Sequence, residues 1–200
     1  MKPAVQRLMD GLRGSRVLVI HPRDREGDML LDQLRRFGCE VVGLWPTPSV
    51  LPTNFDTVFL LIEADQSVTV PDERPTLIAI VDYENPTILR KALDVSAEGV
   101  VNKPLRAFGI LSALVLARAQ HGYVARLNAK VTKLEETLKA RRDIDKAVKI
   151  LMGLKKLEEP ECYELLRQQA TQRRLPMADV ARGIIQAQEA LGGFGLLGSE

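Results

Sequence analysis

The sequence predicts an α/β domain in its first half and an all-α second half. Short apolar runs alternate with helical patterns up to residue 106, a seven-residue apolar repeat follows, and three short basic helical patterns come last. Alternating strands and helices predict a parallel sheet with helical crossovers, as in flavodoxin-like folds. The expected order is a flavodoxin-like domain (1–106), a coiled-coil helix (107–141), an all-α three-helix bundle (142–191) and a flexible tail (192–200).

Apolar runs and turn residues place the elements of the first half. The expected strands are 16–20, 40–44, 57–62, 77–81 and 99–101. The expected helices are 26–37, closed by Gly38, then 87–95, and a third that begins at Arg106. The stretch from Trp45 to Asn54 contains three prolines, so we expect loop there, or at most a degraded helix.

Composition and charge narrow the class of protein. An apolar content of 46% over 200 residues is ample for a folded core, and no apolar run approaches membrane-helix length. With two distant cysteines and no signal peptide, the chain is expected to be cytoplasmic with free buried thiols. The net charge is −2 over residues 1–106 and +4 over 139–182, which favours a polyanion-binding tail or a solvated helical surface.

A heptad repeat begins at Ile110 and predicts a parallel homodimer. Valine at a and leucine at d is a combination that favours two strands, and Lys130 and Glu135 are placed to pair between chains. The alternative is a long helix that packs on its own domain. The predicted dimerisation residues are Val124, Leu127, Val131, Leu134 and Leu138.

The last helical patterns combine an apolar side with many cations, which suits RNA binding through phosphates and loop bases. Arg173 and Arg174 also precede a predicted helix end, so they could instead cap that helix. Tyr163 is left open between a core position and a stacking platform. The predicted RNA contacts are Lys149, Lys155, Lys156, Arg167, Gln168, Arg173 and Arg174.

This helical segment resembles the ANTAR domain of AmiR- and NasR-type transcription antiterminators. The matching residues are Ile144, Ala147, Leu151, Met152, Leu165–Arg167, Ala170, Arg173, Arg174, Pro176, Val180 and Ala181. The sequence departs from the family at Val148, where a lysine is usual, at Cys162, where a small alanine is usual, and at Lys156, where a turn glycine is usual. The resemblance implies binding to leader-RNA hairpins, antitermination, and control by a ligand-sensing partner protein.

The first half resembles the receiver domain of response regulators. The match lies in Asn102-Lys103-Pro104-Leu105 and in the loop from Asp82 to Pro86. Receivers carry an acidic pair after the first strand, a phosphorylatable Asp after the third, and a Ser or Thr after the fourth. The residues here are His21-Pro22, Leu61 and Val81, and Glu63 or Asp65 would substitute only after a register shift. We therefore expect a pseudo-receiver without a phosphorylation site.

Catalytic signatures are missing from the sequence. His21 and His121 are isolated, and no Cys/His cluster or Gly-rich phosphate loop is present. We expect no enzyme activity, no metal and no cofactor, and a solvated His121. The alternatives to RNA antitermination are an atypical DNA-binding response regulator, with 176–190 as recognition helix, and a coiled-coil interaction adaptor.

Overall fold

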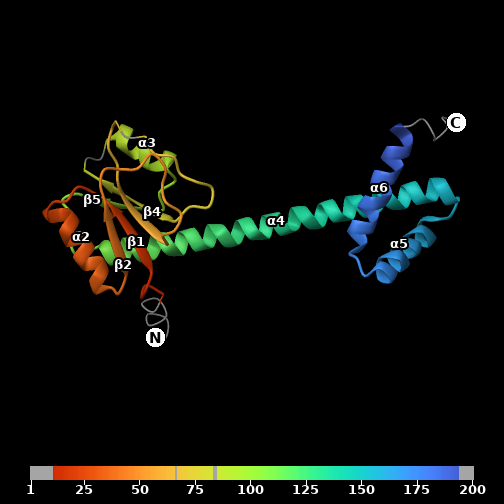
Figure 1. Ribbon diagram of the computed structural model, residues 1–200, viewed down its shortest axis with the longest axis horizontal. Coiled ribbons are helices and arrows are strands. Elements are labelled where there is room, and N and C mark those ends of the chain that lie inside the picture. Colours follow the sequence, from red (N-terminus) through yellow and green to blue (C-terminus); the bar gives the residue numbers. More distant parts are fainter. Residues whose placement is uncertain (1–10, 66, 83–84, 194–200) are drawn as a thin grey trace. The chain divides into compact units, whose positions relative to one another are not determined.

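The computed structural model describes residues 11–65, 67–82 and 85–193 (Figure 1). The chain divides into two compact units, with the division between Arg126 and Leu127. The first unit contains a sheet with helices on both faces, and the second is entirely helical. This is the predicted fold class.

A five-stranded parallel sheet forms the centre of the first unit, in the order β2-β1-β3-β4-β5. Every residue of β3 and β4 is buried, as expected for central strands covered on both faces. Each predicted strand is present to within one residue at either end. The strands are β1 Arg16–Ile20, β2 Glu40–Leu44, β3 Thr57–Leu61, β4 Thr76–Val81 and β5 Gly99–Asn102.

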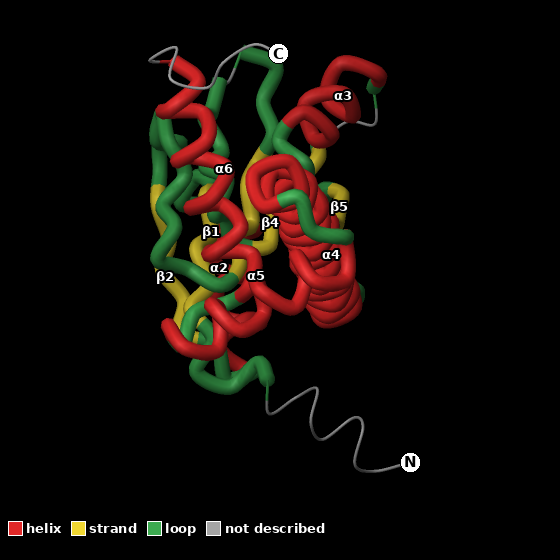
Figure 2. The backbone as a smooth tube through the Cα atoms, turned by 90° about the vertical axis from the view of Figure 1, so that its right-hand side faces the viewer, coloured by secondary structure: helices red, strands yellow, loops and turns green. Residues whose placement is uncertain are grey.

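Two helices, α2 (Arg25–Arg36) and α3 (Pro86–Asp94), cover opposite faces of this sheet (Figure 1, Figure 2). Asp24 caps α2 by accepting hydrogen bonds from the backbone of its first turn, and Asn85 caps α3 in the same way. The stretch from 45 to 54 forms neither a helix nor a strand, in agreement with its three prolines.

The next helix, α4 (Ile110–Lys155), is a single continuous element (Figure 1). It begins four residues after the expected Arg106, because Gly109 has a φ of 95° that is incompatible with a helix. It also continues through the boundary expected at 141/142. No proline interrupts it, so the expected coiled-coil helix and the first helix of the bundle are one element.

The first turns of α4 pack on the sheet of their own unit. Ile110, Leu114 and Ala117 are fully buried beside α2. A Cβ on Gly99 would lie 3.2 Å from the Cβ of Ala117, so glycine permits this close approach. The first part of the repeat therefore packs on its own domain, which was the alternative to dimerisation. The exposed apolar row that could pair with a second copy, named here the dimer seam, begins at Val124.

The second unit packs the end of α4 against α5 (Glu159–Arg173) and α6 (Met177–Gly193). Helix α5 begins with a capping box, in which Glu158 and Glu161 each accept from the other's backbone. The helix α6 includes Gly192 and Gly193, so the flexible tail expected from residue 192 does not begin there, and 194–200 lie outside the described residues.

Candidate nucleic-acid interface

A closed apolar core fixes which side chains of the second unit face outward. Ala147 from α4, Cys162 and Leu166 from α5, and Ala181 from α6 have no exposed surface. The thiols of Cys162 and of Cys39, in the first unit, are free and buried as expected. Because the core occupies the inner side of each helix, the charged residues lie on the outside. All seven predicted RNA contacts are exposed: Lys149, Lys155, Lys156, Arg167, Gln168, Arg173 and Arg174.

The turn between α4 and α5 presents two of these cations. Lys155 is the last residue of α4, and Lys156 follows with a left-handed φ of 52°. The Lys156 amide donates to the Met152 carbonyl at 2.9 Å, which completes the helix end. Glycine is the usual residue for this backbone conformation, in agreement with the turn glycine that the family resemblance places here.

Helix α5 ends in the same manner. Arg173 is its last residue and Arg174 is the C-cap, with a left-handed φ of 54°. The Leu175 amide donates to the Ala170 carbonyl at 3.0 Å. A cation at a helix C-terminus is also favoured by the helix dipole, so this geometry suits both the capping role and a phosphate contact.

One flank of α5 carries an aromatic residue beside cations. Tyr163, Arg167 and Arg174 follow one another at helical spacing of four and seven residues. Tyr163 is 47% exposed, which resolves the open choice in favour of a surface position. Arg167 lies 3.4 Å from Glu164, but both side chains are more than half exposed, so the pair costs little to break.

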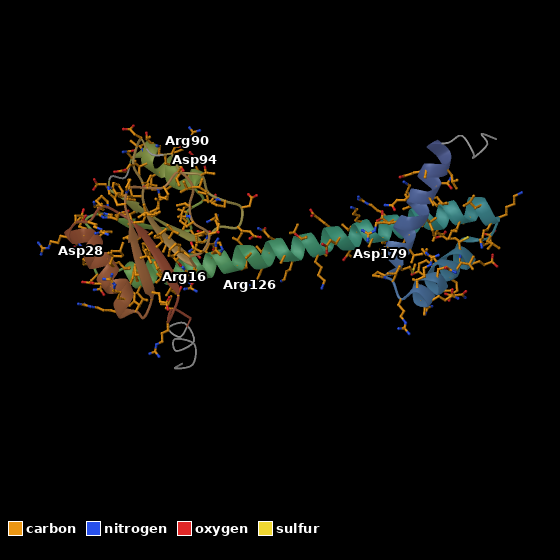
Figure 3. The ribbon with its side chains drawn as sticks, in the orientation of Figure 1. Arg16, Asp28, Arg90, Asp94, Arg126 and Asp179 are labelled. Atoms are coloured by element: carbon orange, nitrogen blue, oxygen red, sulfur yellow. The ribbon has the colours of Figure 1, made fainter. Side chains whose placement is uncertain are left out.

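Helix α6 offers fewer cations than a DNA recognition helix needs. Arg182 is engaged by Asp179 on the same helix, and Figure 3 labels that aspartate. Gln186 is exposed one turn further on. Another ion pair joins Lys146 on α4 to Glu189 on α6 at 2.9 Å. The acidic partners reduce the charge that α6 presents to a polyanion.

The edge of the sheet that corresponds to a receiver's phosphorylation site has different chemistry. Leu61 is 6% exposed and packs in the core, and Val81 is also buried. His21 is buried, and its Nδ1 lies 2.9 Å from the Pro22 carbonyl. Thus an imidazole and two apolar side chains occupy the places where a receiver has its acidic pair, its phosphoacceptor and its switch hydroxyl.

Lys103, the residue that matches the receiver lysine, is held by a carboxylate from α2. Its Nζ lies 3.1 Å from Glu26 Oε2, and the other oxygen of Glu26 accepts from the Leu105 amide at 3.0 Å. Glu63 and Asp65 are exposed beyond the end of β3. The structure therefore brings Lys103 together with Glu26 of α2.

Sequence reasoning missed a partly buried ionic cluster around Glu98. This carboxylate lies 2.7 Å from Arg74 and 2.9 Å from the His121 Nδ1, and it accepts from the Leu77 amide. Burial raises the pKa of Glu98, but the hydrogen bonds from Arg74, His121 and Leu77 outweigh it and hold that pKa below its ordinary value. The expectation of a solvated His121 is wrong; its spacing of four residues from buried Ala117 was the available signal.

Among the described residues, no three histidine, cysteine or acidic side chains are grouped as a metal site would require. The helices in that same part of the chain are all too short or too polar to cross a membrane.

Comparison with known proteins decides the family. Residues 15–118 match the family described as AmiR, N-terminal, and residues 132–185 match the ANTAR domain. The aliphatic amidase regulator of Pseudomonas aeruginosa is 32% identical over 185 residues, which cover 89% of this chain and 94% of that protein. The chain belongs to the AmiR-type regulators with an ANTAR domain. It is therefore related to a protein that is described as a regulator.

Two of the more distant similarities each cover about half of the chain. The transcriptional regulatory protein PdtaR of Mycobacterium tuberculosis is 22% identical over 110 residues, which cover 55% of this AmiR-type chain and 54% of that protein. A response regulator receiver protein from Burkholderia phymatum covers 52% of this chain and 95% of its own, with 17% identity and a TM-score of 0.39.

Proposed function

We propose that this AmiR-type regulator binds hairpins in leader RNA through its ANTAR module, residues 142–191, and so prevents a transcription terminator from forming. The observation that carries the proposal is the placement of exposed cations at both left-handed helix ends, Lys156 and Arg174, around a closed apolar core. Family membership supports the same function.

The chemistry of RNA explains how such a module would act. Side chains cannot read the deep major groove of A-form RNA, so specific contacts go to loops with unstacked bases. Lys149, Lys155 and Lys156 from one helix end, and Arg173 and Arg174 from another, are proposed to hold phosphates. Arg167 and Gln168, with the exposed Tyr163, are proposed to approach loop bases.

A parallel homodimer would present two modules to two hairpins. The dimerisation residues Val124, Leu127, Val131, Leu134 and Leu138 are between 41% and 64% exposed in the single chain. Such a row of exposed apolar side chains on one helix is an unfavourable arrangement in water unless something covers it. In a parallel dimer, the apolar row of each copy would cover the apolar row of the other copy.

We propose that control comes from a partner protein rather than from phosphorylation, as the family resemblance implies. Leu61 offers no phosphoacceptor, and Lys103 is already paired with Glu26. We propose that a ligand-sensing protein sequesters the regulator until a small molecule releases it.

The test is a gel-shift assay with a two-hairpin leader RNA and with duplex DNA, each over a series of salt concentrations. RNA binding with a log-linear loss of affinity in salt is the expected result. Arg173→Ala with Arg174→Ala should weaken hairpin binding on folded protein. Preference for duplex DNA would favour the response-regulator alternative, and binding to neither nucleic acid would favour the adaptor.

A further inference from the structure

Most of the positive charge of the helical half lies in the part of α4 that precedes the three-helix module. Residues 107–141 contain six basic and two acidic side chains, a net charge of +4. The module, residues 142–191, contains nine basic and eight acidic side chains, a net charge of +1. Long-range attraction of a polyanion should therefore come mainly from residues 107–141.

Four of these cations form one line along the helix, which we name the cationic stripe: Arg126, Lys130, Lys133 and Arg141. They occur at steps of four and three residues, with Thr137 completing the series, so they share one helix face. All four are exposed, and Arg126 is labelled on α4 in Figure 3. From first to last the stripe spans about 22 Å of helix.

The stripe lies beside the dimer seam, and its last member, Arg141, continues the d series of Leu127 and Leu134. Arg126, Lys130 and Lys133 directly precede Leu127, Val131 and Leu134 in the sequence. One residue is a rotation of about 100° around a helix, so Arg126, Lys130 and Lys133 remain accessible when the seam is covered. Each copy of a dimer would present its own stripe.

Within a single chain, the stripe is not paired with acidic side chains, and only Lys130 is positioned to pair with Glu135 of a second copy. The acidic residues of 107–142 are Glu135 and Glu136, and neither lies in the series. In the part of the chain that the structure describes, the four stripe cations make no ion pair. In the module, by contrast, Lys146, Arg167 and Arg182 each have an acidic partner. Four like charges on one face repel one another, a cost that a bound polyanion removes.

An aromatic side chain begins the line. Tyr123 is 53% exposed and stands three residues before Arg126. A track of cations with an exposed aromatic ring is the arrangement that proteins use for single-stranded nucleic acid, in which phosphates meet the cations and bases stack on the ring.

We infer that the cationic stripe is a second RNA-binding surface, which holds the single strand that adjoins the hairpin bound by the ANTAR module. This inference rests on the proposed function, because the module must first bind a hairpin. The stripe would supply most of the affinity for RNA and most of its salt dependence, and the module would recognise the hairpin loop.

The test compares three RNAs: a hairpin, the same hairpin with about ten unpaired nucleotides added, and one with an equal number added as a longer stem. The variant is Arg126→Gln with Lys133→Gln. Lys130 is left in place because it is also positioned to pair with Glu135 of a second copy. The matched control, Lys139→Gln with Arg142→Gln, removes the same charge from another face of the same helix.

The unpaired extension should tighten binding of the wild type and of the control, but not of the stripe variant, with all three in the same oligomeric state. The salt slope for the extended RNA should fall by about 1.4 in the stripe variant, the value for two lost single-strand contacts. Equal losses in both variants, or a gain from the longer stem alone, would overturn the inference. Failure of the wild type to bind even the bare hairpin would instead reject the proposed function.

Discussion

Lys156 and Arg174 occupy backbone positions that glycine usually fills. Both have a left-handed φ, and both are exposed cations at the end of a helix. A residue other than glycine in this backbone conformation lowers the free energy of unfolding by on the order of 1 kcal/mol. This sequence therefore retains a charge at two positions where glycine would relieve backbone strain, which is consistent with a functional need for the charge.

Replacing Lys156 by glycine and by alanine separates these two effects. Both changes remove the cation, so both should weaken hairpin binding to a similar extent. Glycine should raise the free energy of unfolding by up to about 1 kcal/mol, and alanine should not, because alanine keeps the left-handed strain. Urea unfolding and hairpin affinity are the measurements. A glycine variant that binds RNA like wild type would remove Lys156 from the interface.

The Glu98 cluster predicts a particular loss of stability in acid. The pKa of Glu98 is depressed in the folded state, so its ionised form stabilises the fold above the ordinary glutamate pKa of 4.5. This contribution should be lost as the pH falls from there through the lower folded pKa. In Glu98→Gln, stability at neutral pH should be lower and the decline in acid shallower. Urea unfolding as a function of pH tests this, with exposed Glu136→Gln as the control that keeps the wild-type decline.

At the scale of elements, the strands were predictable because they are buried apolar runs between turn residues. Val17–Ile20 and Thr57–Leu61 can lie only inside a covered parallel sheet. The start of α4 was predicted too early, because the φ of Gly109 depends on how the chain enters the helix, which the apolar pattern does not record. The spacing of His121 from Ala117 indicates that His121 packs inward, but its pairing with Glu98 and Arg74 was not predictable, because these residues lie far apart in the sequence.

The heptad repeat shows that apolar periodicity alone does not identify what an apolar helix face packs against. The pattern from Ile110 to Leu138 is continuous, yet its first part packs on its own sheet and its second part is exposed. An apolar face at helical spacing indicates that something covers it, but not whether the cover is the same chain or a second copy. The candidate RNA contacts were placed outward correctly because the module's core positions follow a regular period.

The receiver-like sheet edge predicts that acetyl phosphate and Mg²⁺ will not phosphorylate this protein. Leu61 is buried at the acceptor position, and Lys103 is already paired with Glu26. Intact-mass measurement after incubation should therefore find the unmodified mass. A stable adduct on Glu63 or Asp65 would show that β3 presents an acceptor in a shifted position, and it would restore phosphorylation as a means of control.

At the scale of the whole molecule, dimerisation and RNA binding should be coupled through avidity. A dimer that engages two adjacent hairpins makes the second contact intramolecular, which multiplies affinity by about 10² to 10⁴ without any new contact. Charged substitutions at Leu127 and Leu134, both exposed in the single chain, should prevent the seam from pairing. The expected product is a folded monomer, detected by sedimentation and by unchanged helical content.

This monomer should bind an RNA with one hairpin nearly as well as the wild type does, because its module is intact. It should lose most of its affinity only for the two-hairpin leader. A substitution of the same kind at Leu93, an exposed leucine on α3 outside the seam, is the control and should preserve both the dimer and the two-hairpin affinity. Equal losses on both RNAs would mean that the helix seam shapes the module itself, and a dimer that survives the substitutions would place the main interface elsewhere.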